Sequence, residues 1–275
     1  MHVATKILTA LVFCGMFPLA GQPSPDDADL IQRSGFIFRG TVQKSGASNV
    51  KSLAGSPSTN IVRVDEIMKA PKEFSSLLNR DVTVQMRGDS SLKEGQRATF
   101  YTTGWLYGDN LAVKEIAVIT GQTDNQSNLK SQIAATERLA ADQVLAARIG
   151  SAVLVISGKV TSVRPLISQR QSARRSEHDP ELWRAEVDIA AVEKGPQANT
   201  QEANARRQVT VFFAHSQDER WYFSPKFSPG QTGIFLLHTE EVETIKRPGY
   251  TALNRLDFQP SSEINLVRRL IGSGR

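Results

Sequence analysis

The sequence contains the same kinds of segment twice, in the same order, and this repetition constrains the fold more than any other feature. Four pairs of blocks match: FIFRGTV (36–42) with LVISGKV (154–160), VRVDEIMKAP (62–71) with VDIAAVEKGP (187–196), RDVTVQM (80–86) with RQVTVFF (207–213), and EGQRATFY (94–101) with PGQTGIFL (229–236). The partners lie 118, 125, 127 and 135 residues apart, so the distance grows only between blocks. Strands held in place while loops change length would give this pattern, which predicts a duplicated domain. The alternative is that any two strand-rich halves look alike.

Paired blocks also share the phase of their apolar residues. In the third pair, every second position is apolar: Val82, Val84 and Met86 in one block, and Val209, Val211 and Phe213 in the other. Such alternation is typical of strands with one buried face. Gly40 and Gly158 follow the first apolar segment of each repeat, where glycine commonly marks a bend or bulge. We therefore expect a mainly β protein of two tandem OB-like five-stranded barrels, with a connecting helix and a short C-terminal helix.

The blocks resemble the netrin-like module, an OB-fold barrel found in tissue inhibitors of metalloproteinases and in many exported bacterial proteins. The resemblance rests on FRGTV or ISGKV, VDEIMKAP or VDIAAVEKGP, VTV, and GQ followed by Phe, and it covers roughly residues 30–120 and 145–240. The chain departs from the animal members by lacking their cysteines, including the N-terminal one that chelates the target's metal. This departure argues against metalloproteinase inhibition.

The remaining segments complete the expected domain organisation. We expect a signal peptide at 1–20, an exposed tail at 21–29, a first repeat at 30–121, a connecting helix at 126–149, a second repeat at 150–260, and a C-terminal helix and tail at 261–275. The connecting segment is rich in Ala, Leu, Glu and Arg and lacks Pro. Its apolar positions Ile133, Leu139, Val144 and Ile149 suggest packing along one barrel. The C-terminal segment has Ser261 and Ser262 before its apolar positions, although a frayed tail is the alternative.

The N-terminus predicts export. Lys6 precedes an uncharged apolar run at 7–17, and small residues follow at Ala20 and Gly21. The run is shorter than the roughly 20 apolar residues that span a bilayer, so it is typical of a secretory signal peptide. We expect cleavage after Ala20 and a periplasmic or extracellular location. A buried N-terminal strand is the alternative.

Residue usage excludes several kinds of chemistry for the expected mature chain. Cys14 is the single cysteine and lies within the predicted signal peptide, which leaves no thiol for a disulfide, a thiolate metal site or cysteine catalysis. The remaining histidines, His178, His215 and His238, have no metal-binding spacing, and no phosphate-binding loop is present, so we expect no cofactor. The formal charge of +5 permits binding to anionic polymers without requiring it.

One string resembles an enzyme motif. Gly88-Asp89-Ser90 follows a strand, as in the GDS-type lipases and esterases, which also need a histidine three residues after an aspartate. None of the three histidines has an aspartate at that position, so a loop is the preferred interpretation and the protein is predicted not to be an enzyme. The same loop spells Arg-Gly-Asp, a tripeptide that integrins recognise and that also arises by chance.

Two loops of the second repeat are the candidate sites. The segment 164–184 carries Arg164, Arg170, Arg174, Arg175 and Arg184, which would suit phosphates or form a solvated charged surface. The segment 214–231 carries Trp221, Tyr222, Phe223 and Phe227 with Arg220 and Lys226. These aromatic residues could stack on bases or sugars, anchor a protein, or fold back as a lid over the barrel.

Together these features predict an exported, non-enzymatic binding protein with an unidentified protein as its partner. The predicted contact residues are Trp221, Tyr222, Phe223 and Phe227, supported by Arg174 and Arg175. The alternative is a binder of polyanions, single-stranded nucleic acid or glycans, and a further one is a GDS-type ester hydrolase.

Overall fold

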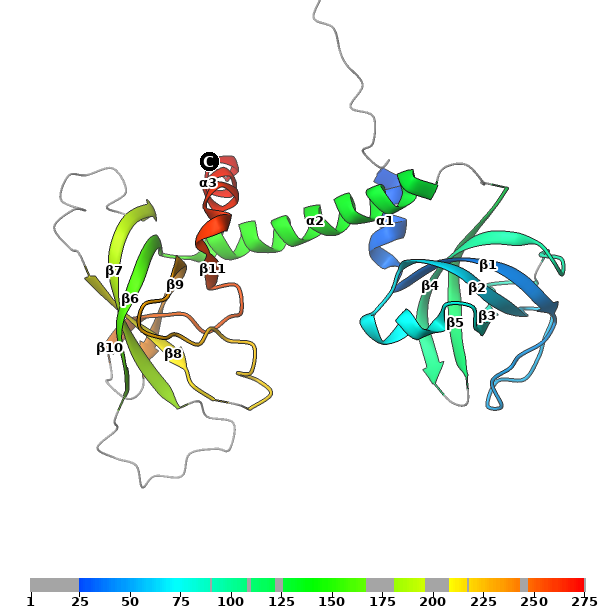
Figure 1. Ribbon diagram of the computed structural model, residues 1–275, viewed down its shortest axis with the longest axis horizontal. Coiled ribbons are helices and arrows are strands. Elements are labelled where there is room, and N and C mark those ends of the chain that lie inside the picture. Colours follow the sequence, from blue (N-terminus) through cyan, green and yellow to red (C-terminus); the bar gives the residue numbers. More distant parts are fainter. Residues whose placement is uncertain are drawn as a thin grey trace, which may run out of the picture. The chain divides into compact units, whose positions relative to one another are not determined.

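The chain forms two compact units, residues 1–139 and 140–275. The computed structural model describes residues 25–89, 91–107, 110–121, 126–166, 181–195, 208–216, 218–242 and 247–274. Both units consist mainly of strands, as predicted (Figure 1). The predicted signal peptide lies outside the described residues.

The first unit is a closed five-stranded barrel. Its elements are α1 (Pro25–Arg33), β1 (Phe36–Ser45), β2 (Thr59–Lys69), η1 (Lys72–Leu77), β3 (Asp81–Gln85), β4 (Arg97–Tyr107) and β5 (Leu111–Thr120). The strand order is β1-β2-β3-β5-β4, with β1 pairing to both β2 and β4. Only the β3–β5 pair is parallel among these pairings. The expected five-stranded barrel is therefore present in this unit.

Aromatic side chains fill this barrel. The ring of Phe38 stacks on Phe36 at 4.6 Å and on Phe100 at 5.1 Å. Phe74 from η1 meets Phe36 edge-on at 5.5 Å. All four side chains are almost fully buried, so the short irregular segment after β2 contributes a core residue rather than a solvated turn.

The second unit is built on a six-stranded sheet. Its elements are β6 (Leu154–Pro165), β7 (Leu182–Lys194), β8 (Gln208–Ala214), β9 (Thr232–Val242), β10 (Arg247–Thr251), β11 (Phe258–Pro260), η3 (Ser261–Glu263) and α3 (Ile264–Ser273). The sheet order is β10-β8-β7-β6-β9-β11, and β10 also pairs with β9. The sixth strand, β11, was not predicted. It is three residues long and pairs antiparallel with β9.

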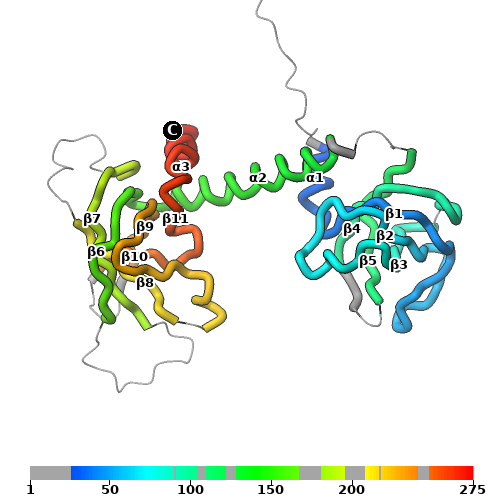
Figure 2. The backbone as a smooth tube through the Cα atoms, in the orientation of Figure 1, coloured from blue at the N-terminus to red at the C-terminus, as the bar shows by residue number. Residues whose placement is uncertain are grey.

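The five main strands of the second unit pair as those of the first unit do. The pairs β6–β7, β7–β8, β9–β10 and β6–β9 are antiparallel and β8–β10 is parallel, matching β1–β2, β2–β3, β4–β5, β1–β4 and β3–β5. Figure 2 traces the backbone through the labelled strands of each unit, β1 to β5 in the first and β6 to β11 in the second. The repeat seen in the sequence thus corresponds to a repeat of the pairing pattern.

The correspondence extends to single residues. Gly40 lies opposite Val64, and Gly158 lies opposite Ile189, as the block offsets require. The β1–β2 register shifts between residues 37 and 38, 39 and 40, and 42 and 44. The β6–β7 register shifts at the equivalent places, between 155 and 156, 157 and 158, and 160 and 162. The bends of the first strand therefore recur with the strand itself.

The same steric constraint explains why both positions are glycine. A Cβ atom on Gly40 would lie 2.6 Å from the carbonyl oxygen of Arg63, and one on Gly158 would lie 2.4 Å from that of Asp188. Neither distance is compatible with a side chain unless the backbone moves. Each glycine thus permits close approach of two bent strands, as the sequence pattern suggested.

Each repeat also begins with a helix whose C-terminal end is bound by a lysine. Lys69 Nζ donates to the carbonyl of Ile31 at 2.9 Å, at the end of α1. Lys194 Nζ donates to the carbonyls of Ile149, Gly150 and Ala152 at 2.7, 2.8 and 2.8 Å. A cation at this end satisfies free carbonyls and the helix dipole. Residues 25–29 of the expected exposed tail are thus helical, because α1 continues into Ile31, which is buried under β1.

The apolar positions of the connecting helix α2 (Gln126–Ser151) suggested that it packs along one barrel, but the structure differs. Ile133 packs in the first unit with Ile37 and Tyr101. Ile149 packs in the second unit with Val155 and other core residues. Leu139 and Val144 are each 56% exposed. The expectation was wrong because the apolar positions belong to two separate contacts, one near each end of the helix.

Candidate binding surface

The predicted aromatic residues lie in a turn between β8 and β9, which we call the aromatic turn (residues 218–227). Backbone hydrogen bonds define it: the N–H of Trp221 donates to the carbonyl of Asp218 at 2.9 Å, and the N–H of Ser224 donates to the carbonyl of Trp221 at 3.0 Å. The N–H of Arg220 also donates to Asp218 Oδ1 at 2.9 Å. The turn therefore has a defined backbone conformation.

The side chain of Lys226 reinforces the turn. Its Nζ donates to the carbonyls of Trp221 and Ser224 at 2.8 and 3.1 Å, and to Ser224 Oγ at 2.7 Å. Burial of the ammonium group lowers the pKa of Lys226. This lysine is thus committed to the protein's own backbone and is not a free cation for a ligand.

Phe227 is a core residue, which corrects its prediction as a contact residue. It is 5% exposed, and its ring lies 5.0 Å from Phe213, 5.3 Å from Phe235 and 5.5 Å from Phe258. Among the predicted loop aromatics, Phe227 agrees with the alternative prediction, in which the aromatic residues fold back onto the protein. Its burial attaches the aromatic turn to the core of the second unit.

Tyr222 and Phe223 behave in the opposite way. They are 63% and 71% exposed, and their rings meet edge to face at 5.1 Å. Trp221 is half-buried, and the guanidinium of Arg220 lies 5.0 Å from the centre of its ring. Three predicted contact residues are therefore adjacent, and two of them present their rings to solvent.

A second aromatic contact lies where β8 leads into the aromatic turn. The rings of Trp183 and His215 stack at 4.2 Å, with 28° between their planes. The N–H of His215 donates to the carbonyl of Glu181 at 2.8 Å. Trp183 Nε1 is buried and has no hydrogen-bond partner among the residues that the structure describes. No local sequence pattern predicts this pair, because only the register between β7 and β8 brings the two residues together.

Other predicted positions fall at the limits of the described residues. Arg174, Arg175 and Ser90 lie outside them, so the supporting arginines and the candidate nucleophile have no described geometry. Of the Arg-Gly-Asp tripeptide, Arg87 donates its backbone N–H to Glu115 Oε2 at 3.0 Å, and Asp89 is exposed.

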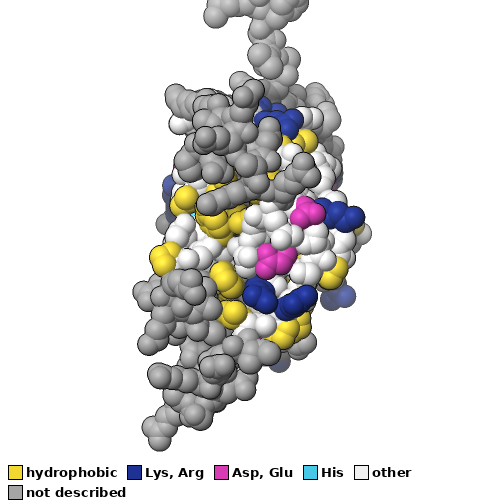
Figure 3. Space-filling model, turned by 90° about the vertical axis from the view of Figure 1, so that its left-hand side faces the viewer, with side chains coloured by type: hydrophobic (Ala, Val, Ile, Leu, Met, Phe, Trp, Pro, Cys, Tyr) yellow, Lys and Arg dark blue, Asp and Glu magenta, His cyan; other side chains and the backbone are white. Residues whose placement is uncertain are grey.

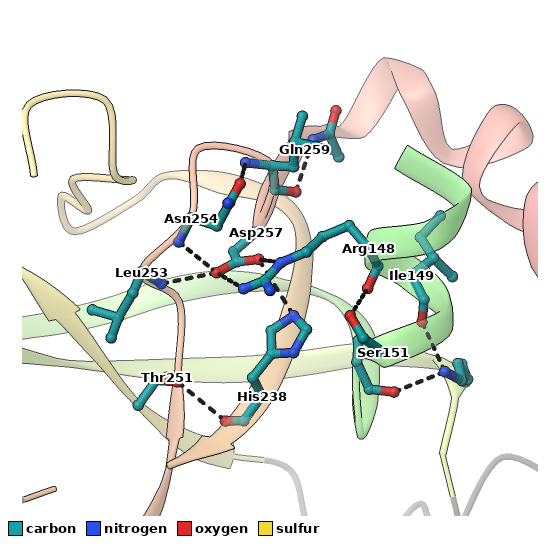
Figure 4. Close-up of polar contacts among 12 residues, drawn as sticks. Arg148, Ile149, Ser151, His238, Thr251, Leu253, Asn254, Asp257 and Gln259 are labelled. Carbon is teal, nitrogen blue, oxygen red and sulfur yellow. Dashed lines mark hydrogen bonds and ion pairs between the residues drawn. The ribbon is translucent and has the colours of Figure 1, made fainter. Parts of the chain in front are cut away.

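One buried polar cluster contains the functional groups of a catalytic dyad. His238 Nε2 lies 3.4 Å from Asp257 Oδ1, and Arg148 Nε and Nη2 donate to Asp257 Oδ1 and Oδ2 at 2.6 and 2.8 Å (Figure 4). The backbone N–H groups of Leu253 and Asn254 donate to Asp257 Oδ2 at 2.8 and 2.7 Å. Asp257 is fully buried, and its acceptors are directed at the protein's own donors. The cluster therefore joins α2 to the turn before β11.

The surroundings of His238 in this cluster favour its neutral form. The pKa of His238 is lowered, mainly because burial penalises the imidazolium and next because Arg148 repels it. The carboxylates of Asp257 and Glu240 oppose this shift. Protonation of the buried imidazole at acidic pH is therefore unfavourable in the folded chain.

A small cavity of about 140 Å³ lies in the first unit between α1, α2 and strands β4 and β5. Its lining residues are Asp27, Thr99, Tyr101, Ile119, Asn128, Leu129 and Gln132. Burial, and then the charge of Asp27, raises the pKa of Tyr101, so its hydroxyl stays protonated. The volume corresponds to only a few water molecules, at about 30 Å³ each.

The described part of the chain contains neither a metal-binding cluster nor a membrane-spanning helix. No group of three or more His, Cys, Asp or Glu residues there is arranged to hold a metal ion. No helix among the described residues has the length and apolar character needed to cross a membrane.

No protein-family model matches the chain, and no curated protein matches it.

Proposed function

We propose that this chain is an exported, non-enzymatic binding protein and that it contacts its partner through the aromatic turn of the second unit. The observation that carries this proposal is the exposure of two adjacent rings, Tyr222 and Phe223, on a turn with a defined backbone. Buried aromatic anchors at the centre of an interface supply much of the binding energy of protein complexes. A pre-ordered turn also loses less conformational entropy on binding.

The same proposal includes the fold: both units would be OB-like barrels of the netrin-like kind. The closed barrel of the first unit and the repeated strand pairings of the second support two OB-like barrels. OB barrels serve many functions, so the fold alone does not select a partner. The contact surface is assigned to the second unit because the first has no aromatic residues in the equivalent segment 87–96.

A photoreactive amino acid placed at Phe223 would test the proposal. We expect discrete crosslinked products with proteins of the exported fraction, and we expect Tyr222→Ser to reduce them. The matched control is the same probe at Leu78, which is 48% exposed in the first unit. Equal products from both probes, or none from the Phe223 probe, would contradict the proposed surface.

The second candidate function is binding of anionic polymers, and the Arg220–Trp221 contact at 5.0 Å favours it. An arginine over an aromatic ring is a common platform for nucleic-acid bases. The test is a titration with a labelled single-stranded oligonucleotide and with heparin at low and near-physiological salt. Binding that persists at physiological salt and is lost in Trp221→Ala would favour this function. Binding only at low salt would count against it.

A further inference from the structure

The ladder between β6 and β7 is longer than its counterpart in the first unit. The β1–β2 ladder ends at Ser45 opposite Asn60, which corresponds to Val163 opposite Ala185. Two further pairs follow in the second unit, Arg164 opposite Arg184 and Pro165 opposite Trp183. The extension thus adds two arginines directly across from each other.

This arrangement has an electrostatic cost. Residues directly opposite in an antiparallel pair have Cβ atoms about 5 Å apart, and like charges there are destabilising. Both Arg164 and Arg184 are exposed. In the part of the chain that the structure describes, neither forms an ion pair or a hydrogen bond through its side chain. Among the described residues, no acidic side chain therefore forms an ion pair with either arginine.

Other charged pairs of opposing residues have complementary signs. Lys159 lies opposite Asp188 in the same ladder. In the first unit, Arg63 lies opposite Asp81, with Nε 3.0 Å from Oδ1. Figure 3 views the second unit from the side on which β6 and β7 lie in Figure 1, and it shows both basic and acidic side chains on this face. The arginine pair thus departs from the charge pairing found elsewhere.

The nearest acidic residue along β7 is already engaged. Glu186 lies two residues from Arg184 and opposite Ser162, and its Oε2 accepts a hydrogen bond from Thr210 Oγ1 at 2.8 Å. Its carboxylate is thus directed toward β8. An external anion would supply the negative charge that the arginine pair lacks.

We propose that Arg164 and Arg184 together bind a phosphate or sulfate group. Guanidinium groups donate paired hydrogen bonds to the oxygens of such anions, and two arginines across one ladder pair can reach the same group. The bound anion would also remove the repulsion between them. Because the site lies on β6 and β7, it does not depend on the function proposed for the aromatic turn.

Calorimetric titration of the full chain with inorganic phosphate and, separately, with inorganic sulfate would test the site. We expect saturable binding that becomes about tenfold weaker in Arg164→Gln and in Arg184→Gln, because each variant loses charge-assisted hydrogen bonds. Lys159→Gln is the matched control, since it removes one exposed cation of the same ladder that lies opposite an acidic residue, Asp188, and not opposite another cation. It should bind both anions as the unmodified chain does. Binding of phosphate alone would assign the site to phosphate esters, and binding of sulfate alone to sulfate esters.

Thermal unfolding provides a second readout. In dilute chloride, Arg164→Gln should raise the midpoint of the second unit by relieving repulsion, whereas Lys159→Gln should lower it. Phosphate at equal ionic strength should raise the midpoint of the unmodified chain more than that of either arginine variant. Absence of binding, equal affinities in all variants, or an equal loss in Lys159→Gln would overturn the proposal.

Discussion

At the scale of single residues, the loop between β8 and β9 assigns different roles to neighbouring aromatic side chains. Phe227 is buried among Phe213, Phe235 and Phe258, whereas Tyr222 and Phe223 are mostly exposed. We expect Phe227→Ala to lower the free energy of unfolding by about 3–5 kcal/mol, as is typical of a truncated core phenylalanine. Chemical denaturation monitored on the second unit would measure this loss.

The exposed pair provides the control for that prediction. Tyr222→Ala and Phe223→Ala should each change the free energy of unfolding by no more than about 0.5 kcal/mol, because exposed side chains away from structural contacts contribute little. A large loss of stability in either variant would show that these rings support the fold. In that case they would not be available as a contact surface.

The lowered pKa of His238 should make the free energy of unfolding depend on pH. Because burial lowers its pKa in the folded chain below the ordinary value of 6.5, the unfolded chain binds the proton more readily. The free energy of unfolding should therefore fall as the pH decreases below about 6.5. Above that pH, the titration of His238 should leave it unchanged. Denaturation series between pH 5 and about pH 8 would show a shallower decline in His238→Gln. Thr239→Ala, an exposed neighbour on β9, should retain the original slope.

At the scale of elements, the first strand of each repeat depends on its glycine. Gly40→Ala and Gly158→Ala should each destabilise their own unit by about 1–3 kcal/mol, because the new methyl group would contact a backbone carbonyl of the neighbouring strand. Gly150→Ala is the matched control, since nothing lies within 4 Å of its would-be Cβ atom in α2. It should stabilise the helix by about 0.5–1 kcal/mol. Urea denaturation would compare the three variants, and similar losses at all positions would refute the steric explanation.

Elements also show what local sequence patterns capture. The alternating apolar residues of β3 and β8 were sufficient to predict strands. The glycines of β1 and β6 were sufficient to predict that the first strand of each repeat bends. Helix α1 was missed because Pro25, Asp26 and Asp27 resemble an exposed tail. Its burial depends on Ile31, and its end is bound by Lys69, which lies 38 residues further along the chain.

At the scale of the whole molecule, each unit has its own core and should respond separately to a mutation. Asp257→Asn removes one partner of the buried contact with Arg148, at a cost of about 3 kcal/mol. Only the second unit should become less stable, because both residues belong to it. Hydrogen exchange resolved by peptide would measure each unit independently. Asp81→Asn, which breaks the exposed pair with Arg63, should cost the first unit less than about 1 kcal/mol.

The sequence by itself determined the mainly β class, the duplication and the phase of most strands, because alternation and glycine positions reflect the local geometry of a half-buried strand. It also located the aromatic residues of the candidate surface. Only the tertiary structure decided that Phe227 is buried while Tyr222 and Phe223 are exposed. The same holds for the opposition of Arg164 and Arg184 and for the contact of Arg148 with Asp257 across 109 residues. These features depend on strand register and on long-range packing, which bring together residues that no local pattern relates.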